Sequence, residues 1–123
     1  DIAVALNSAF FSDYAVVPST AVAKIPENVS FEIASLLGCA VVSGYGAVVN
    51  TAEVQVGSSI LVVGLGGVGL SSVMSSKIRG AYPIIGVDPS SERRDLGKEV
   101  PGPTKANYVY NSLSPELKKW VET

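Results

Sequence analysis

The sequence contains no histidine and one cysteine, Cys39, among its 123 residues. Without histidine, this chain taken alone has no Ser-His or Cys-His nucleophile pair and no His-ligated metal site. A single cysteine excludes an intramolecular disulfide and is typical of a reducing compartment. We therefore expect a cytoplasmic location.

Charge of either sign is also scarce. Nine Lys and Arg residues against eleven Asp and Glu residues give a formal net charge of −2, which predicts no basic surface for nucleic acid. The longest apolar stretches are interrupted by Gly or Ser before they reach the roughly 20 residues that a membrane-spanning helix needs, and the N-terminus does not have the pattern of a signal peptide. We expect neither a nucleic-acid partner nor a membrane.

Apolar residues make up 47% of the sequence and charged residues 16%, which is typical of a globular protein with one core. The first residue is Asp1, and apolar residues follow it directly, from Ile2 to Leu6. We read the sequence as a piece of a longer protein.

The first half of the sequence predicts short strands and then helices. Tyr14–Val17 and Val22–Ile25 are β-favouring runs, each ended by a proline. Ser30 is a candidate N-cap for a helix that runs to Gly38, and a second helical stretch follows from Cys39 to Glu53.

The second half alternates between strands and helices. The predicted strands are Ile60–Val63, Ile84–Val87 and Tyr108–Tyr110, and the predicted helices are Leu70–Arg79, Ser91–Lys98 and one that starts at Pro115. The first strand is apolar at every position, as expected for a parallel strand covered on both faces. The order β-α-β-α-β-α predicts an α/β fold with a parallel sheet.

A glycine-rich turn, Gly64-Leu65-Gly66-Gly67-Val68-Gly69, follows the first of these strands. In the G-x-G-x-x-G pattern the first glycine allows a tight turn, the second lets a pyrophosphate approach the backbone, and the third lets helix and sheet pack closely. Asp88 ends the next strand, 19 residues after Gly69, where a carboxylate accepts hydrogen bonds from the adenosine ribose of NAD and disfavours the 2′-phosphate of NADP.

Two other interpretations fit part of this pattern. A glycine-rich crossover occurs in unrelated α/β proteins, and S-adenosylmethionine methyltransferases also carry an acidic residue after their second strand. Those methyltransferases usually lack the Gly-x-Gly-Gly-Val-Gly form of the turn. The strand, the turn, the helix and Asp88 together favour NAD.

Further motifs resemble zinc-dependent medium-chain alcohol dehydrogenases, with the glutathione-dependent formaldehyde dehydrogenase branch indicated by overall similarity alone. The resemblance runs from about Phe11 to Lys98, and more loosely to Asn111. It is carried by these segments: Phe11-Ser-Asp-Tyr-Ala-Val-Val-Pro18, Ala23-Lys-Ile-Pro26, Leu37-Gly-Cys-Ala40, Ser43-Gly-Tyr-Gly-Ala47, Val63-Gly-Leu-Gly-Gly-Val-Gly-Leu70 and Ile84-Ile-Gly-Val-Asp88.

The resemblance implies roles for four more residues. Cys39 is similar to a ligand of the catalytic zinc, although a lone cysteine is also a common core residue. Ser43 resembles the hydroxyl residue beside the nicotinamide, or is a helix serine bonded back to a carbonyl. Val68 is expected against the nicotinamide end of the cofactor. Arg93 resembles a basic residue that reaches the adenosine ribose or phosphate, or is an exposed arginine near a helix start.

The resemblance also implies what this chain lacks. The family's other catalytic zinc ligands, its structural-zinc cysteines and the second half of its Rossmann sheet have no counterpart here. We therefore expect residues 1–30 to be a remnant of the GroES-like catalytic domain and residues 31–123 to be the first half of the NAD-binding Rossmann domain, a partial β-α-β-α-β fold.

The expected function is that of an NAD-dependent oxidoreductase acting on an alcohol or aldehyde. Zinc would bind only in the complete protein, because an open catalytic site needs three protein ligands, so this chain alone is expected to be inactive. The alternatives are a non-catalytic NAD-binding or sensing module and a purely structural piece. An unpaired sheet edge is expected to favour self-association.

Overall fold

The computed structural model describes residues 10, 12–99, 106, 108–110 and 115. The chain divides into two compact units, Asp1–Ser30 and Phe31–Thr123, and each is described by itself. In the first unit the regular element among the described residues is the 3₁₀ turn η2 (Ser19–Ala21).

The two strands expected in the first unit do not form. Residues 14–17 and 22–25 have no regular secondary structure, and the side chains of Tyr14 and Val16 are almost fully exposed. A strand needs a neighbouring strand to satisfy its backbone N–H and C=O groups, and the described part of this unit contains none. β propensity alone was therefore a misleading signal here.

The second unit starts with one continuous helical run instead of two helices. It consists of α1 (Phe31–Leu36), η3 (Leu37–Val41), α2 (Val42–Gly46) and η4 (Ala47–Thr51), of which η3 and η4 are π-helical. The predicted stop at Gly38 is wrong: a glycine weakens a helix interior by about 1 kcal/mol but does not terminate it.

This helical run has a mean hydropathy of 1.6 over its most apolar 18-residue window, so by length and composition it is long and apolar enough to cross a membrane. The expectation that glycine and serine break up the apolar stretches is wrong for these residues. Length and composition are weak evidence for a membrane, because a core helix of a globular protein passes the same test.

A parallel three-stranded sheet with the order β1-β2-β3 forms the centre of the second unit. Its strands are β1 (Ile60–Val63), β2 (Ile84–Val87) and β3 (Tyr108–Tyr110), with the predicted bounds. The register pairs Ile60 with Ile84 and Ile85 with Tyr108.

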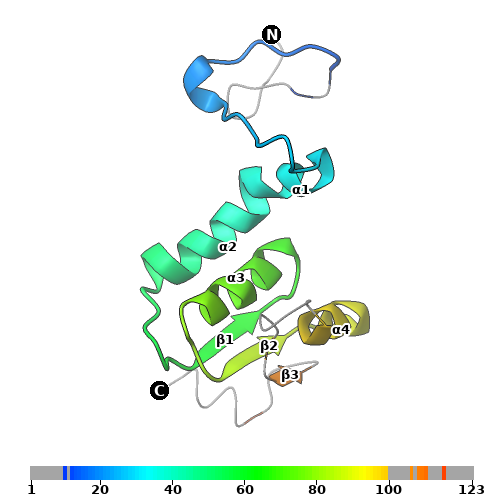
Figure 1. The fold of residues 1–123 in the computed structure, drawn as a ribbon. Coiled ribbons are helices and arrows are strands. Elements are labelled where there is room, and N and C mark those ends of the chain that lie inside the picture. Colours follow the sequence, from blue (N-terminus) through cyan, green and yellow to red (C-terminus); the bar gives the residue numbers. More distant parts are fainter. Residues whose placement is uncertain (1–9, 11, 100–105, 107, 111–114, 116–123) are drawn as a thin grey trace. The chain divides into compact units, whose positions relative to one another are not determined.

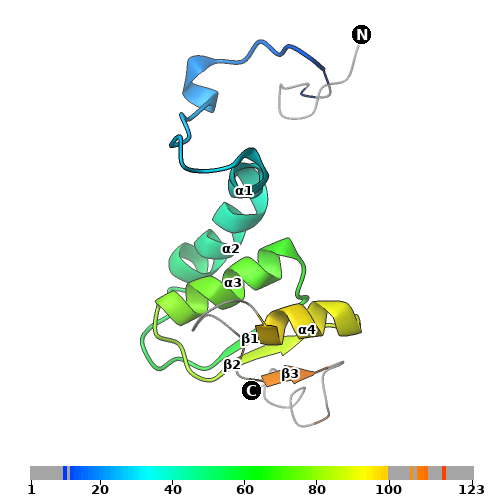
Figure 2. The ribbon, with the colours of Figure 1, turned by 45° about the vertical axis from the view of Figure 1, so that its right-hand side comes forward.

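Helix α3 (Gly67–Ile78) connects β1 to β2, and α4 (Ser91–Glu99) follows β2. Both helices lie on the same side of the sheet in two views (Figures 1 and 2). The helix α3 begins three residues earlier than predicted, so it includes part of the glycine-rich turn. At its other end the C-cap is Arg79, and the chain turns at the next residue, Gly80, whose φ of 76° is common for a glycine just after a helix.

The core lies between α3, the sheet and the helical run. Val73 and Ile84 are completely buried, and Leu65 is 1% exposed. Val48 of η4 and Val54 belong to the same cluster. This packing fixes α3 against the sheet, and with it the turn that leads from β1 into α3.

Candidate nucleotide-binding site

The turn from β1 into α3 is tight, and two of its glycines are required by the protein's own geometry. Gly64 has a φ of 95°, which disfavours any residue with a Cβ, and its N–H donates to the Val87 carbonyl at 2.7 Å. A Cβ placed on Gly69 would collide with the Gly64 carbonyl oxygen. Residues 64 and 69 therefore have to be glycine for this turn to form at all.

Gly66 differs from those two glycines, because the protein's packing does not require it. It is the N-cap of α3 with an ordinary extended backbone, at φ −75° and ψ −168°. A Cβ placed on Gly66 would meet nothing within 4 Å. The absence of a side chain at this position leaves the backbone of the turn open to the outside.

The backbone N–H groups at the start of α3 lie next to this open position. The Leu70 N–H donates to the Gly66 carbonyl at 2.8 Å, so the N–H groups of residues 67–69 precede the first turn of intrahelical bonds. Such groups, together with the positive end of the helix dipole, favour a bound anion such as a phosphate.

Asp88 is the buried charge of the site. It directly follows β2, is 1% exposed, and points at the turn: its Oδ2 accepts the Leu65 N–H at 2.8 Å. Its Oδ1 accepts the Ser90 N–H at 2.8 Å. These two backbone bonds, with a smaller contribution from the charge of Arg93, lower the pKa of the Asp88 carboxyl and outweigh the opposing effect of burial.

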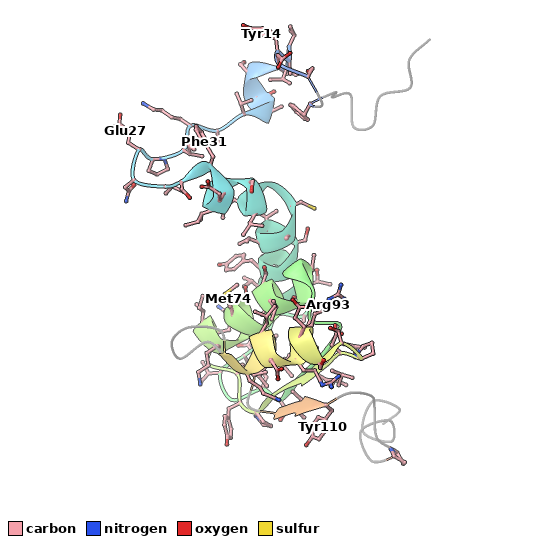
Figure 3. The ribbon with its side chains drawn as sticks, turned by 90° about the vertical axis from the view of Figure 1, so that its right-hand side faces the viewer. Tyr14, Glu27, Phe31, Met74, Arg93 and Tyr110 are labelled. Atoms are coloured by element: carbon pink, nitrogen blue, oxygen red, sulfur yellow. The ribbon has the colours of Figure 1, made fainter. Side chains whose placement is uncertain are left out.

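Two arginines of α4 lie beside Asp88. The Arg93 guanidinium is 3.7 Å from Asp88 Oδ2, and its side chain is 58% exposed. It projects from α4 in Figure 3. Arg94 instead donates to the backbone carbonyls of Asp88 and Pro89, at 2.9 and 2.8 Å. Arg93 is therefore the arginine whose charge remains available to a ligand beside the carboxylate.

The remaining predicted site residues lie on the neighbouring helices. Val68 is in the first turn of α3 and 45% exposed. Cys39 lies in η3 and is exposed, so it is not the buried apolar cysteine of the alternative interpretation. Ser43 lies in α2 and is exposed. Among the described residues, no hydrogen bond or ion pair joins the Cys39 or Ser43 side chain to the turn.

The helical run nevertheless reaches the turn through small residues. A Cβ placed on Gly67 would lie 3.2 Å from the Ala40 Cβ, and one on Gly44 would lie 2.6 Å from the Val68 carbonyl oxygen. Residues next to Cys39 and Ser43 thus contact the start of α3. The sequence contained a signal for this contact, since a glycine inside a helix often marks a close approach.

Leu65 was predicted among the cofactor-binding residues of the turn, but its place in the core was not predicted. In the G-x-G pattern it occupies a variable position, yet its side chain is buried. It lies over β2, where a Cβ placed on Gly86 would come within 3.1 to 3.2 Å of the Leu65 methyl groups. Leu65 is therefore held at both its side chain and its N–H.

A metal site does not form within the described residues: they contain no group of three or more His, Cys, Asp and Glu side chains able to hold an ion. Cys39 alone supplies one ligand, which is fewer than the three that a catalytic zinc needs. The described residues of this chain therefore do not fit a complete zinc site.

A parallel α/β sheet, a glycine-rich turn at a helix N-terminus and a buried carboxylate after the next strand together define the class of the site, one suited to a nucleotide. No protein-family model matches the chain. Its sequence nevertheless matches part of the zinc-type alcohol dehydrogenases.

Two curated relatives are the alcohol dehydrogenase class-3 of Cereibacter sphaeroides and the S-(hydroxymethyl)glutathione dehydrogenase of Paracoccus denitrificans. The first is 43% identical and aligns with 85% of this chain and 31% of its own length. The second is 42% identical over 72% of this chain and 24% of its length. The chain thus spans 24% to 31% of the length of these relatives.

The chain is also similar to part of a solved structure. The acetophenone reductase of Geotrichum candidum, in complex with NAD, superimposes with a TM-score of 0.66 at 31% identity, covering 76% of this chain and 26% of its own.

Proposed function

We propose that the turn of residues 64–69, together with Asp88 and Arg93, holds NAD. The backbone N–H groups of Gly67, Val68 and Gly69 would bind the diphosphate, Asp88 the adenosine ribose, and Arg93 the ribose or a phosphate oxygen. The observation that carries the proposal is Gly66, which the fold does not need as glycine but which a diphosphate approaching the backbone does need.

We further propose that residues 31–123 are the first half of a Rossmann domain. The sheet order β1-β2-β3, with α3 and α4 as the connections, is the order of the first three strands of that fold. Residues 1–30 would then be a remnant of the adjoining catalytic domain.

In the complete protein, this half would serve an alcohol or aldehyde oxidoreductase located in the cytoplasm. Bound NAD supplies a hydride acceptor. In that protein Cys39 would contribute one zinc ligand, Ser43 would lie beside the nicotinamide, and Val68 would pack against the nicotinamide end. The described residues of this chain do not form a whole zinc site.

Calorimetric titration of the 123-residue chain with NAD tests the proposal. We expect saturable binding at one site and binding of NADP weaker by about tenfold or more, since its 2′-phosphate would approach the buried negative charge of Asp88. Gly66→Ala, which adds a methyl group at the open position, should abolish NAD binding. Equal affinity of Gly66→Ala and the original chain for NAD would contradict the proposal.

A second candidate function, a nucleotide-binding module without chemistry, is favoured by one observation: the described residues include the glycine-rich turn with Asp88 beside it, but no group of side chains that could hold a metal ion. Turnover assays of the isolated chain with zinc, NAD and short alcohols do not distinguish the two. NAD binding without turnover is expected from both the module and the inactive fragment, and measurable turnover would exclude both. Activity restored by adding the missing part of a relative would favour the fragment.

A further inference from the structure

We propose that Asp88 is a positioning residue for the glycine-rich turn: its carboxylate holds Leu65, and through it residues 66–69, in the shape that a diphosphate needs before any nucleotide has bound. This role is additional to a contact with ribose. It rests on the proposed NAD function only in its last step, which concerns the ligand.

The first part of the case is that the carboxylate is already engaged in the ligand-free chain. A buried charge is costly unless hydrogen bonds satisfy it, and Asp88 is 1% exposed. Both of its oxygens accept a backbone N–H at 2.8 Å, one from Leu65 and one from Ser90. Hydrogen bonds to an ionised acceptor are about twice as strong as those between neutral groups.

The second part is where the bond from Leu65 falls in the turn. The preceding N–H, that of Gly64, is bonded to the Val87 carbonyl, and the Leu70 N–H is bonded to the Gly66 carbonyl. Leu65 is the link between these two fixed points. Its buried side chain holds it from one side and Asp88 holds its N–H from the other.

The third part concerns the direction of the free N–H groups. With the Leu65 N–H bonded inward to the carboxylate, the groups that remain for a diphosphate are those at the start of α3. If the Leu65 N–H lost its partner, the turn would have an unsatisfied donor in a buried position, and rearrangement of residues 65–67 would be the way to relieve it. Asp88 therefore preorganises the turn.

The decisive experiment is amide hydrogen exchange in the ¹⁵N-labelled chain without nucleotide, comparing Asp88→Asn with the original. An asparagine keeps the shape but provides one carbonyl oxygen, with no charge, in place of two carboxylate oxygens. We expect exchange at the Leu65 amide to rise about tenfold or more, while the Gly64 amide, whose bond does not involve Asp88, stays unchanged. Unchanged exchange at Leu65 would overturn the proposal.

Asp95→Asn is the matched control, because it removes an exposed carboxylate of α4 whose described partner is Lys98 and not the turn. Its Leu65 exchange should equal that of the original chain. If Asp88→Asn does not fold, the original chain still decides the matter. Its Leu65 amide proton should shift with the same midpoint as the Asp88 carboxyl carbon as the pH is lowered, and a Leu65 proton that does not follow that titration overturns the proposal.

The last step uses inorganic pyrophosphate, a diphosphate without ribose. If Asp88 acted only through ribose, Asp88→Asn should bind pyrophosphate equally well or more tightly, because a negative charge is gone. If Asp88 positions the turn, we expect affinity to fall about threefold or more. Arg93 is the cation that faces Asp88, so pyrophosphate binding is also measured in Arg93→Gln, which should weaken it without changing Leu65 exchange.

The outcomes separate this inference from the proposed function. A chain that binds neither NAD nor pyrophosphate, but whose Leu65 amide exchange rises in Asp88→Asn, would overturn the NAD proposal. It would still support the proposal that Asp88 positions the turn. A chain that binds NAD, but whose Leu65 amide exchange does not change in Asp88→Asn, would support the NAD proposal and overturn the proposal that Asp88 positions the turn.

Discussion

At the scale of single residues, the glycines of the turn have different physical reasons to be there. Gly64 is required by its positive φ and Gly69 by its contact with the Gly64 carbonyl. Neither requirement involves a ligand, so both glycines would be needed in any protein with this turn. Gly66 is the position at which a mutation can change ligand binding with little effect on the stability of the fold.

Gly66→Ala and Gly69→Ala should therefore differ in their effects: the first should affect NAD binding, and the second should affect the stability of the fold. We expect Gly66→Ala to lower the free energy of unfolding by less than about 1 kcal/mol, the usual difference between these residues at an N-cap, while removing NAD binding. Gly69→Ala should cost about 3 kcal/mol or more, because its Cβ would overlap a backbone oxygen. Urea denaturation monitored by circular dichroism measures both. A large stability loss in Gly66→Ala would indicate that its glycine serves the fold.

The lowered pKa of Asp88 makes the stability of the chain depend on acid. Because the carboxyl ionises more readily in the folded chain than in the unfolded one, its contribution is complete above the ordinary aspartate pKa of about 3.9. It is lost as the pH falls through the lower folded-state value. The free energy of unfolding, measured by urea denaturation between pH 7 and pH 3, should fall more steeply with acid in the original chain than in Asp88→Asn.

Asp95→Asn provides the reference for this comparison. It removes one carboxylate without touching the turn, so its acid profile should stay close to that of the original chain. If Asp88→Asn keeps the full acid dependence, the Asp88 carboxylate does not contribute to stability in the way that its two backbone bonds indicate.

At the scale of elements, the sequence predicted the second unit well where local and tertiary signals agree. The strands β1, β2 and β3 have the predicted bounds, because each is a short β-favouring run that also finds a neighbouring strand to pair with. The predicted strands Tyr14–Val17 and Val22–Ile25 do not form, because a strand needs a partner strand and a local sequence pattern does not report one. The stop at Gly38 failed because helix packing outweighs the propensity of one residue.

The candidate site was also predicted where the local sequence pattern and the tertiary arrangement agree. The motif predicted the turn and the direction of Asp88, since both depend on strand ends that meet at one edge of the sheet. It did not predict the Leu65 side chain as a core group, nor the bond from its N–H to Asp88. These depend on which face of β2 has room, and that room is provided by Gly86.

The contact between α2 and α3 allows a test with two glycines in one helical run. Gly44 lies against Ser71, whose Cβ would be 2.6 Å from an added Cβ, whereas Gly38 has nothing within 4 Å. Gly44→Ala should therefore destabilise the chain by about 1 to 3 kcal/mol. Gly38→Ala should stabilise it by about 0.5 to 1 kcal/mol, because alanine favours a helix over glycine.

Thermal or urea denaturation of the two variants gives the comparison. Because both changes are the same in chemistry, the difference between them isolates the packing of α2 on α3. Two variants with equal stability would mean that α2 does not pack against α3 in solution.

At the scale of the whole molecule, the sheet has a free edge. In the described part of the chain β1 pairs with β2 alone, so one row of its backbone groups has no strand partner. The Ile60 and Gly64 N–H groups both bond toward the β2 side. By the two-residue period of a strand, the N–H groups of Leu61 and Val63 point to the other edge. A free edge of this kind favours pairing with another chain.

We therefore expect the chain to self-associate through β1, and Val63→Lys to oppose it. Val63 is 66% exposed, so a lysine there fits the folded chain but places a charge on the edge that a second copy would meet. The dissociation constant of the dimer, measured by analytical ultracentrifugation, should rise about tenfold, which corresponds to about 1.4 kcal/mol. Val56→Lys is the matched control: Val56 is 85% exposed and outside the strand, so it adds the same charge without touching the edge. If both variants weaken association equally, net charge governs it, and the free edge of β1 is not the contact.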